Sequence, residues 1–184
     1  MPPASLVSGT VRSVAPRSER LRFLPGFLDD LLARLTPSRP QERPVEEVVA
    51  MVDEVLDVLG VGGQREDDEE GFDWSVQVGS AILEIGIHAN EVLGETTIEV
   101  RSPILRLPPE NLLAFYRRCL ELNRIVVGCC IGVDKDVMIV AAERRVQDLS
   151  RNDFVQMLLN VASAADQFDD ELAQEFGARK LGDT

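Results

Sequence analysis

Apolar residues recur at intervals of three and four along two long stretches of the chain, which is the spacing of amphipathic helices. Residues 45–59 follow Pro44, a residue type that favours the first turn of a helix. Residues 151–176 continue the apolar stripe for about seven turns. They follow Ser150, which can cap a helix, and Asp153 lies three residues later, as in a capping box. We therefore expect a helix in each stretch.

Three stretches between these helices alternate apolar and polar residues, the pattern of strands that bury one face. They cover residues 72–78, 81–88 and 95–105, and their short separators favour an antiparallel meander. Pro103 is expected to end the third strand, because proline donates no hydrogen bond to a neighbouring strand. The acidic run 66–70 is interpreted as a solvated loop. A cation site is the alternative, although the run lacks the residue order of a calcium loop.

A further helix and two strands are expected in between. Residues 108–122 start with two prolines and end at Asn123, which favours a helix of about three to four turns. Residues 124–133 and 136–145, joined by a hairpin turn at 134–135, are apolar on both faces. Such strands lie in the centre of a sheet or beneath a partner subunit. The expected fold is therefore α+β, an antiparallel sheet with helices in the order α-β-β-β-α-β-β-α.

The N-terminal part of the chain has a different composition. Residues 1–22 are rich in proline, serine and arginine without periodicity, which predicts a disordered leader. Residues 23–36 carry apolar side chains at helical spacing and predict an extra amphipathic helix. The prolines of residues 37–44 predict a stiff linker. We expect one compact domain over residues 45–177 and a flexible tail at 178–184.

Composition and charge narrow the possible functions. Of 184 residues, 45% are hydrophobic, enough for a core without metal ions or disulfide bonds. The formal net charge is −13, although the first 43 residues hold seven arginines against four acids. An acidic surface repels phosphate backbones and anionic lipids, so binding to nucleic acid or to a membrane is not expected. No stretch has the apolar length of a signal peptide or a membrane span, and a cytoplasmic location is expected.

The inventory of catalytic side chains is small. His88 is the only histidine, so any cysteine–histidine or serine–histidine pair would include it; we interpret it as a surface or hydrogen-bonded residue. The three cysteines, Cys119, Cys129 and Cys130, do not fit a secreted disulfide framework and are interpreted as structural core residues. The chain contains no phosphate loop, nucleophile elbow, dinucleotide fingerprint or Cys-x-x-Cys pair. We expect no catalytic residue, no cofactor and no metal ion.

Two kinds of charged cluster leave alternatives open. Asp166 and Asp170 lie one turn apart on the last predicted helix and could hold a metal ion, although a solvated helix face is the simpler interpretation. The arginine pairs at 117–118 and 144–145 could bind an anion. Surface ion pairs that offset the acidic excess are the simpler interpretation.

From about residue 44 to residue 176 the chain resembles the YbjN family, which shares the fold of the type III secretion (Tir-like) chaperones. The resemblance is carried by the element order and by a diffuse pattern in the second half of the chain. An asparagine follows the second helix, then come a strand rich in small residues, a turn with an aspartate, a further strand, Leu-Ser and a long helix with Ala-Asp. These positions are Asn123, Gly128, Asp134, Leu149, Ser150, Ala165 and Asp166.

This resemblance implies an acidic, cytoplasmic homodimer that holds an extended segment of a partner protein, without ATP and without a catalytic centre. We therefore expect a non-enzymatic, protein-binding chaperone or adaptor. A permanent regulatory or structural subunit of a complex is the alternative. A carboxylate-based, metal-dependent enzyme is less favoured. The resemblance does not extend to the leader or to residues 23–36.

Two binding surfaces are expected from the apolar patterns. A partner segment would add a strand beside residues 72–78 and contact the first helix, at Phe72, Trp74, Val76, Val78, Val48 and Val52. The dimer interface would lie on the second helix and the strands after it, at Phe115, Tyr116, Cys119, Val127, Cys129 and Ile131. The helix at 23–36 would either cover the domain's own apolar surface or occupy the groove of a neighbouring subunit.

Overall fold

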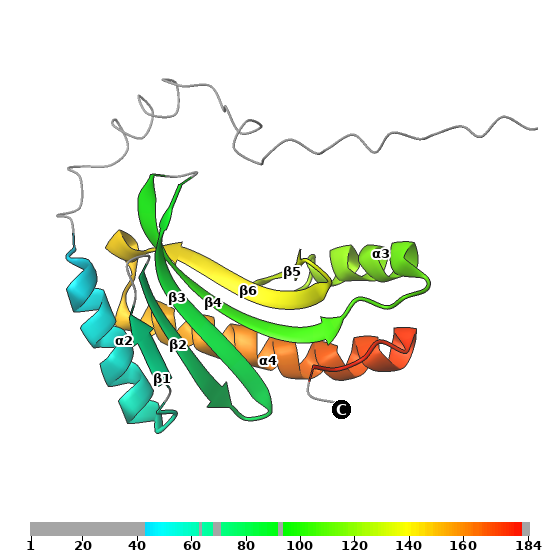
Figure 1. Ribbon diagram of the computed structural model, residues 1–184, viewed down its shortest axis with the longest axis horizontal. Helices are drawn as coiled ribbons and strands as arrows, with labels where there is room; N and C mark the ends of the chain where they lie inside the picture. The colour runs from blue at the N-terminus through cyan, green and yellow to red at the C-terminus, as the bar shows by residue number, and fades with distance from the viewer. Residues whose placement is uncertain (1–42, 63, 68–70, 92–93, 182–184) are drawn as a thin grey trace, which may run out of the picture. The chain divides into compact units, whose positions relative to one another are not determined.

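The computed structural model describes residues 43–62, 64–67, 71–91 and 94–181, which form three α-helices and a six-stranded antiparallel sheet (Figure 1). The leader, the extra N-terminal helix and most of the linker were predicted for residues outside these ranges. The elements in chain order are α2 (Val45–Leu59), β1 (Gln64–Asp67), β2 (Gly71–Val78), β3 (Ala81–Asn90), β4 (Glu95–Arg106), α3 (Leu112–Leu122), β5 (Cys130–Asp134), β6 (Val137–Arg145), the 3-10 turn η2 (Val146–Asp148) and α4 (Arg151–Phe176). This is the predicted α+β order with one additional strand, β1.

The strands lie in the order β1-β2-β3-β4-β6-β5, and the predicted meander of β2, β3 and β4 is confirmed. Both later strands were expected in the centre of the sheet or beneath a partner, but only β6 is internal, whereas β5 forms an edge. Residues 124–129 were expected to begin β5. They form turns instead, because the amides of Ile125 and Val126 donate to the carbonyl of Leu122 at the end of α3.

Two expectations about strand boundaries were wrong. The first part of the acidic run 66–70 belongs to β1, where Glu66 pairs with Asp73 of β2. In addition, β4 continues through Pro103 to Arg106. The register between β4 and β6 shifts between Pro103 and Leu105. Such an irregularity tolerates a residue that lacks an amide donor.

The helix termini follow from local side-chain chemistry. The capping box of α4 is confirmed: Ser150 Oγ accepts from the Asp153 amide at 3.1 Å, and the Asp153 carboxylate accepts from the Ser150 amide at 3.2 Å. By contrast, α3 begins at Leu112 and not at residue 108. Asn111, immediately before it, has a φ of 57°, a left-handed conformation that cannot continue from the prolines as a helix.

The core lies between one face of the sheet and the helices α2 and α4. The helix α4 runs along the sheet and contacts β3, β4 and β6, and α2 packs beside it (Figure 1). Alternate residues of the strands face these helices and are buried, among them Trp74, Val76, Leu83, Ile85, Ile98, Val100, Met138 and Val140. The opposite face of the sheet, which we call the open face, carries the intervening polar and charged residues.

The C-terminal residues that the structure describes are held against the sheet. The amide of Arg106 donates to the carbonyl of Arg179 at 3.0 Å, and the amide of Leu181 donates to the carbonyl of Ile104 at 3.2 Å. Ala178 is buried. Residues 178–181, expected in a flexible tail, are therefore attached to β4. None of the helices in the described ranges has the length and apolar character needed to cross a membrane.

Candidate functional site

The residues predicted to bind a partner segment are brought together, but inside the protein. Trp74, Val76, Val48 and Val52 are buried in the core between β2 and α2, and the remaining two, Phe72 and Val78, are half-buried against it. The alternation on β2 correctly indicates one apolar face. The chain's own helix α2 covers that face, and its apolar stripe fills the space that a partner segment was expected to occupy.

Asp53 of α2 forms hydrogen bonds with side chains of two strands, β1 and β2. Its carboxylate accepts the indole N–H of Trp74 at 2.8 Å and a guanidinium N–H of Arg65 at 2.7 Å. The guanidinium carbon of Arg65 also lies 5.9 Å from the centre of the Trp74 ring, within the range of cation–π contacts. Asp53 therefore links α2, β1 and β2. The sequence offered no signal for this link, because its three residues meet only in the folded chain.

The residues predicted at the dimer interface lie at the end of the molecule formed by α3, residues 123–129 and β5, which we call the α3 end. Three of them, Phe115, Cys119 and Ile131, are buried, whereas Tyr116 and Cys129 are half-buried. Only Val127 is largely exposed, at 80%. Buried Phe115 packs edge-on against Phe176 of α4, with ring centres 5.3 Å apart. Most of this predicted set therefore attaches α3 to its own domain.

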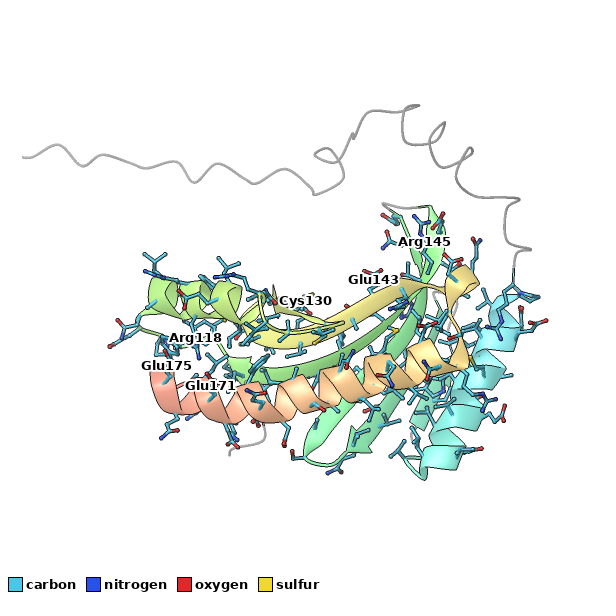
Figure 2. All side chains as sticks on the ribbon, turned by 180° about the vertical axis from the view of Figure 1, so that it is seen from behind. Arg118, Cys130, Glu143, Arg145, Glu171 and Glu175 are labelled. Carbon is cyan, nitrogen blue, oxygen red and sulfur yellow. The ribbon has the colours of Figure 1, made fainter. Side chains whose placement is uncertain are left out.

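The cysteines do not share one environment. Burial raises the pKa of the Cys119 thiol to about 11, and burial also raises the pKa of Cys129. Both thiols are therefore protonated at neutral pH and act as core residues. Cys130 was expected in the core as well, but it is exposed on β5 (Figure 2). Neighbouring strand residues point to opposite faces, and Ile131, next to Cys130 on β5, is buried, so Cys130 lies on the exposed side of the strand.

Aliphatic side chains are concentrated on the surface of the α3 end. Of the large hydrophobic residues exposed in the described ranges, more than half come from this region: Leu112, Leu113, Leu120, Ile125, Val127 and Val133. Leu113 and Leu120 lie two turns apart and therefore on the same side of α3. Single exposed aliphatic residues are common, whereas a large exposed apolar patch is typical of an interaction surface.

At Ile131 the backbone edge of β5 is already occupied by a side chain. The Asn123 side-chain amide accepts from the Ile131 N–H at 2.7 Å and donates to the Ile131 carbonyl at 3.2 Å. These peptide groups point away from β6, so the amide fills the position that an added strand would take. Asn123 belongs to the family pattern in the sequence, but its role is visible only in the structure.

A hollow of about 370 Å³ lies on the open face. Its lining includes Asp73, Glu84, Gly86, His88, Glu99 and Arg101. His88 Nε2 lies 3.0 Å from Asp73 Oδ1, and Arg101 donates to Glu84 at 2.7 Å. A Cβ at Gly86 would lie 2.7 Å from His88 Nε2, so this glycine allows the imidazole to lie close to the sheet. The interpretation of His88 as a hydrogen-bonded residue is confirmed.

The arginine pairs are engaged by acids. Arg118 of α3 contacts Glu171 and Glu175 of α4 (Figure 2). Arg117 pairs with Glu121 at 3.0 Å and Arg144 with Asp153 at 3.5 Å. Arg145 Nε lies 2.6 Å from Glu95 Oε2, an ion pair without the alignment of a hydrogen bond. Surface ion pairs, the simpler interpretation, therefore account for both arginine pairs.

The acids predicted as a possible metal site are also engaged. Asp166 accepts a hydrogen bond from Ser80, and Asp170 pairs with Lys180. Within the described ranges, no three His, Cys, Asp or Glu side chains are grouped so that they could hold a metal ion. The possible cation site at 66–70 extends into residues outside those ranges.

The chain is similar to known proteins both in its sequence pattern and in its fold. Residues 46–184 match the family described as T3SS (YopN, CesT) and YbjN peptide-binding chaperone 1. No curated protein sequence matches the chain. The structure of the ExsC–ExsE complex is similar, with 16% identity and a TM-score of 0.53 over 69% of this chain and 94% of that chain. An uncharacterised protein from Methanothermobacter thermautotrophicus has 17% identity and a TM-score of 0.50 over 69% and 97%. These two likenesses concern the fold. The family match spans most of the compact domain, and the chain therefore belongs to the T3SS and YbjN peptide-binding chaperone family.

Proposed function

We propose that this protein is a non-enzymatic chaperone or adaptor that binds an extended segment of a partner protein. The match of residues 46–184 to a family of peptide-binding chaperones carries this proposal. The similar structure is that of the ExsC–ExsE complex, which gives a precedent for a protein partner on this fold. The cytoplasm suits the function, because the exposed free thiol of Cys130 is typical of a reducing compartment.

We also propose that two copies associate through the α3 end. The exposed aliphatic residues of α3 and of the loop after it support this interface, because their burial between two copies removes apolar surface from water. A homodimer interface buries the same patch on both subunits. The Asn123 amide blocks the edge of β5, so the contact would form through side chains and not through a continuous sheet.

The segment-binding surface predicted at β2 remains a proposal with an added requirement. The strand β2 pairs with β1 on one side and with β3 on the other, so strand addition requires the incoming segment to replace β1. Trp74 would then lose its contact with Arg65. A shift in Trp74 emission on binding of a verified partner supports this site. An unchanged emission spectrum places the segment elsewhere.

The function is tested by isolating the native partner and then reconstituting the complex. The tagged protein is used for affinity capture from the native cytoplasm, and the co-eluting protein is identified. Overlapping peptides of that protein are then titrated calorimetrically. Saturable binding of one extended segment to the isolated protein supports the chaperone or adaptor. A partner that binds only as a folded whole, at fixed stoichiometry and without exchange, supports the permanent subunit instead.

A further inference from the structure

The open face has an unusual arrangement of charge at its centre. Glu99 lies on β4, in the interior of the sheet, and its side chain points away from the helices. Across the sheet it faces Gly86 of β3 on one side and Glu143 of β6 on the other. Two glutamates directly opposite one another in an antiparallel pair repel, which destabilises the sheet. Figure 2 shows Glu143 on β6 near Arg145.

The neighbouring charges compensate Glu99 only in part. Arg101 is bonded to Glu84, and His88 is paired with Asp73. Glu143 accepts a hydrogen bond from the Asn90 amide at 3.0 Å. No hydrogen bond or ion pair joins the Glu99 carboxylate to another residue in the described ranges. Burial raises the pKa of Glu99. The charge of Arg101 opposes this shift, whereas the charges of Glu143 and Glu84 add to it.

The hollow on the open face adjoins this carboxylate. It includes Glu99 in its lining, and a second hollow of about 200 Å³ is lined by both Glu99 and Glu143. Gly86, directly across from Glu99, has no side chain of its own, and the imidazole of His88 lies over it. The volume of the first hollow, about 370 Å³, is comparable with the smaller ligand pockets of proteins, about 300–1,000 Å³. The arrangement therefore combines an unpaired carboxylate, a second carboxylate opposite it and space for a side chain from outside.

We propose that the open face binds a partner segment through an arginine or lysine side chain that enters the hollows beside Glu99 and pairs with Glu99 and Glu143. This inference rests on the proposed function and names the chemistry of the bound segment. A guanidinium group presents several N–H donors and can bond both carboxylates, which converts their repulsion into attraction. A metal ion is a poorer fit, because no group of three suitable ligands exists in the described ranges.

The geometry of a sheet adds a preference for an extended segment. In an extended chain, residues i and i+2 point to the same side. Basic residues at alternate positions would therefore meet the acids of the open face together, whereas the residues between them would face solvent. The cations already on this face, His88, Arg101 and Arg145, form their ion pairs with acids other than Glu99.

The probes for this site are two fluorescent nine-residue peptides. One alternates arginine with threonine, and the other has the neutral isostere citrulline in place of each arginine. The full-length protein is titrated with each peptide by fluorescence anisotropy. We expect the arginine peptide to bind at least about ten-fold more tightly than the citrulline peptide, since hydrogen bonds between charged groups are about twice as strong as those between neutral groups.

Paired variants then locate the contact. Glu99→Gln with Glu143→Gln is expected to weaken binding of the arginine peptide about ten-fold or more. The control, Glu46→Gln with Glu110→Gln, makes the same change in net charge at exposed positions elsewhere and is expected to change binding less than about two-fold. Glutamine is nearly isosteric with glutamate, and thermal melts verify that both variants fold. Amide NMR signals of Gly86 and Glu99 are expected to shift on addition of the arginine peptide to the unmodified protein.

Three results would overturn the inference. These are no binding of the arginine peptide, equal binding of both peptides, and equal weakening by the control variant and the site variant. None of them contradicts the proposed function, because a native segment can still bind at another surface. Conversely, if no native segment binds in the calorimetric test while the arginine peptide binds at Glu99, the proposed function fails and the cation site stands.

Discussion

Leu113 offers a quantitative test of the proposed dimer. It lies on the outer side of α3 and is 84% exposed. The change Leu113→Ala removes three carbons, and at about 0.8 kcal/mol for each carbon a fully exposed side chain would lose about 2.4 kcal/mol of burial energy. Scaled to the exposed fraction of 84%, the loss is about 2 kcal/mol for each copy.

A two-fold interface contains this side chain twice, so the dimer would lose about 4 kcal/mol, or roughly a thousand-fold in its dissociation constant. Sedimentation velocity over a concentration series measures that constant. Val58→Ala is the matched control, because Val58 is 77% exposed on α2, away from α3 (Figure 1). A dissociation constant that changes less than three-fold in Leu113→Ala would refute the interface. So would an unmodified protein that is monomeric at tens of micromolar.

Three further predictions concern single side chains. Asp53→Ala leaves the Trp74 indole N–H without its acceptor and is expected to lower the free energy of unfolding by about 1–3 kcal/mol in urea titrations, with a red shift of Trp74 emission. Ser150→Ala removes the cap of α4 and is expected to cost about 1 kcal/mol, whereas no loss in the urea midpoint would contradict the role of the capping box. Glu99→Gln is expected to raise the melting temperature at pH 7. Because the pKa of Glu99 is raised in the folded state, the native protein takes up a proton more readily than the unfolded chain. The unmodified protein therefore gains stability relative to Glu99→Gln as the pH falls through that pKa. If the difference in melting temperature between the two proteins does not narrow at low pH, this explanation is wrong.

Local patterns predicted most of the elements correctly. The capping box at Ser150 and Asp153 can be read from sequence because its two partners lie within one turn of each other. The same holds for the alternation of β2 and β3, which depends only on the two-residue period of a strand. The family pattern around Asn123 also indicated the correct family.

Positions in the sheet were harder to predict. The hydrophobicity of residues 124–133 suggested a strand in the centre of the sheet or beneath a partner subunit. The central position is wrong for β5, which is an edge strand, because strand order depends on which segments pair across the folded chain. Pro103 was expected to stop β4, but the register shift against β6 accommodates it. Neither the edge nor the register shift leaves a mark in the local sequence.

In the candidate sites, too, local patterns could be predicted from the sequence, whereas contacts between distant residues could not. The spacing of residues along the chain is enough to predict that β2 has an apolar face and that α2 has an apolar stripe. The folded chain adds that these surfaces cover each other, that α3 leaves aliphatic residues exposed, and that Glu99 lies opposite Glu143. The physical reason is that burial and charge pairing depend on distances between residues far apart in sequence, which periodicity does not contain.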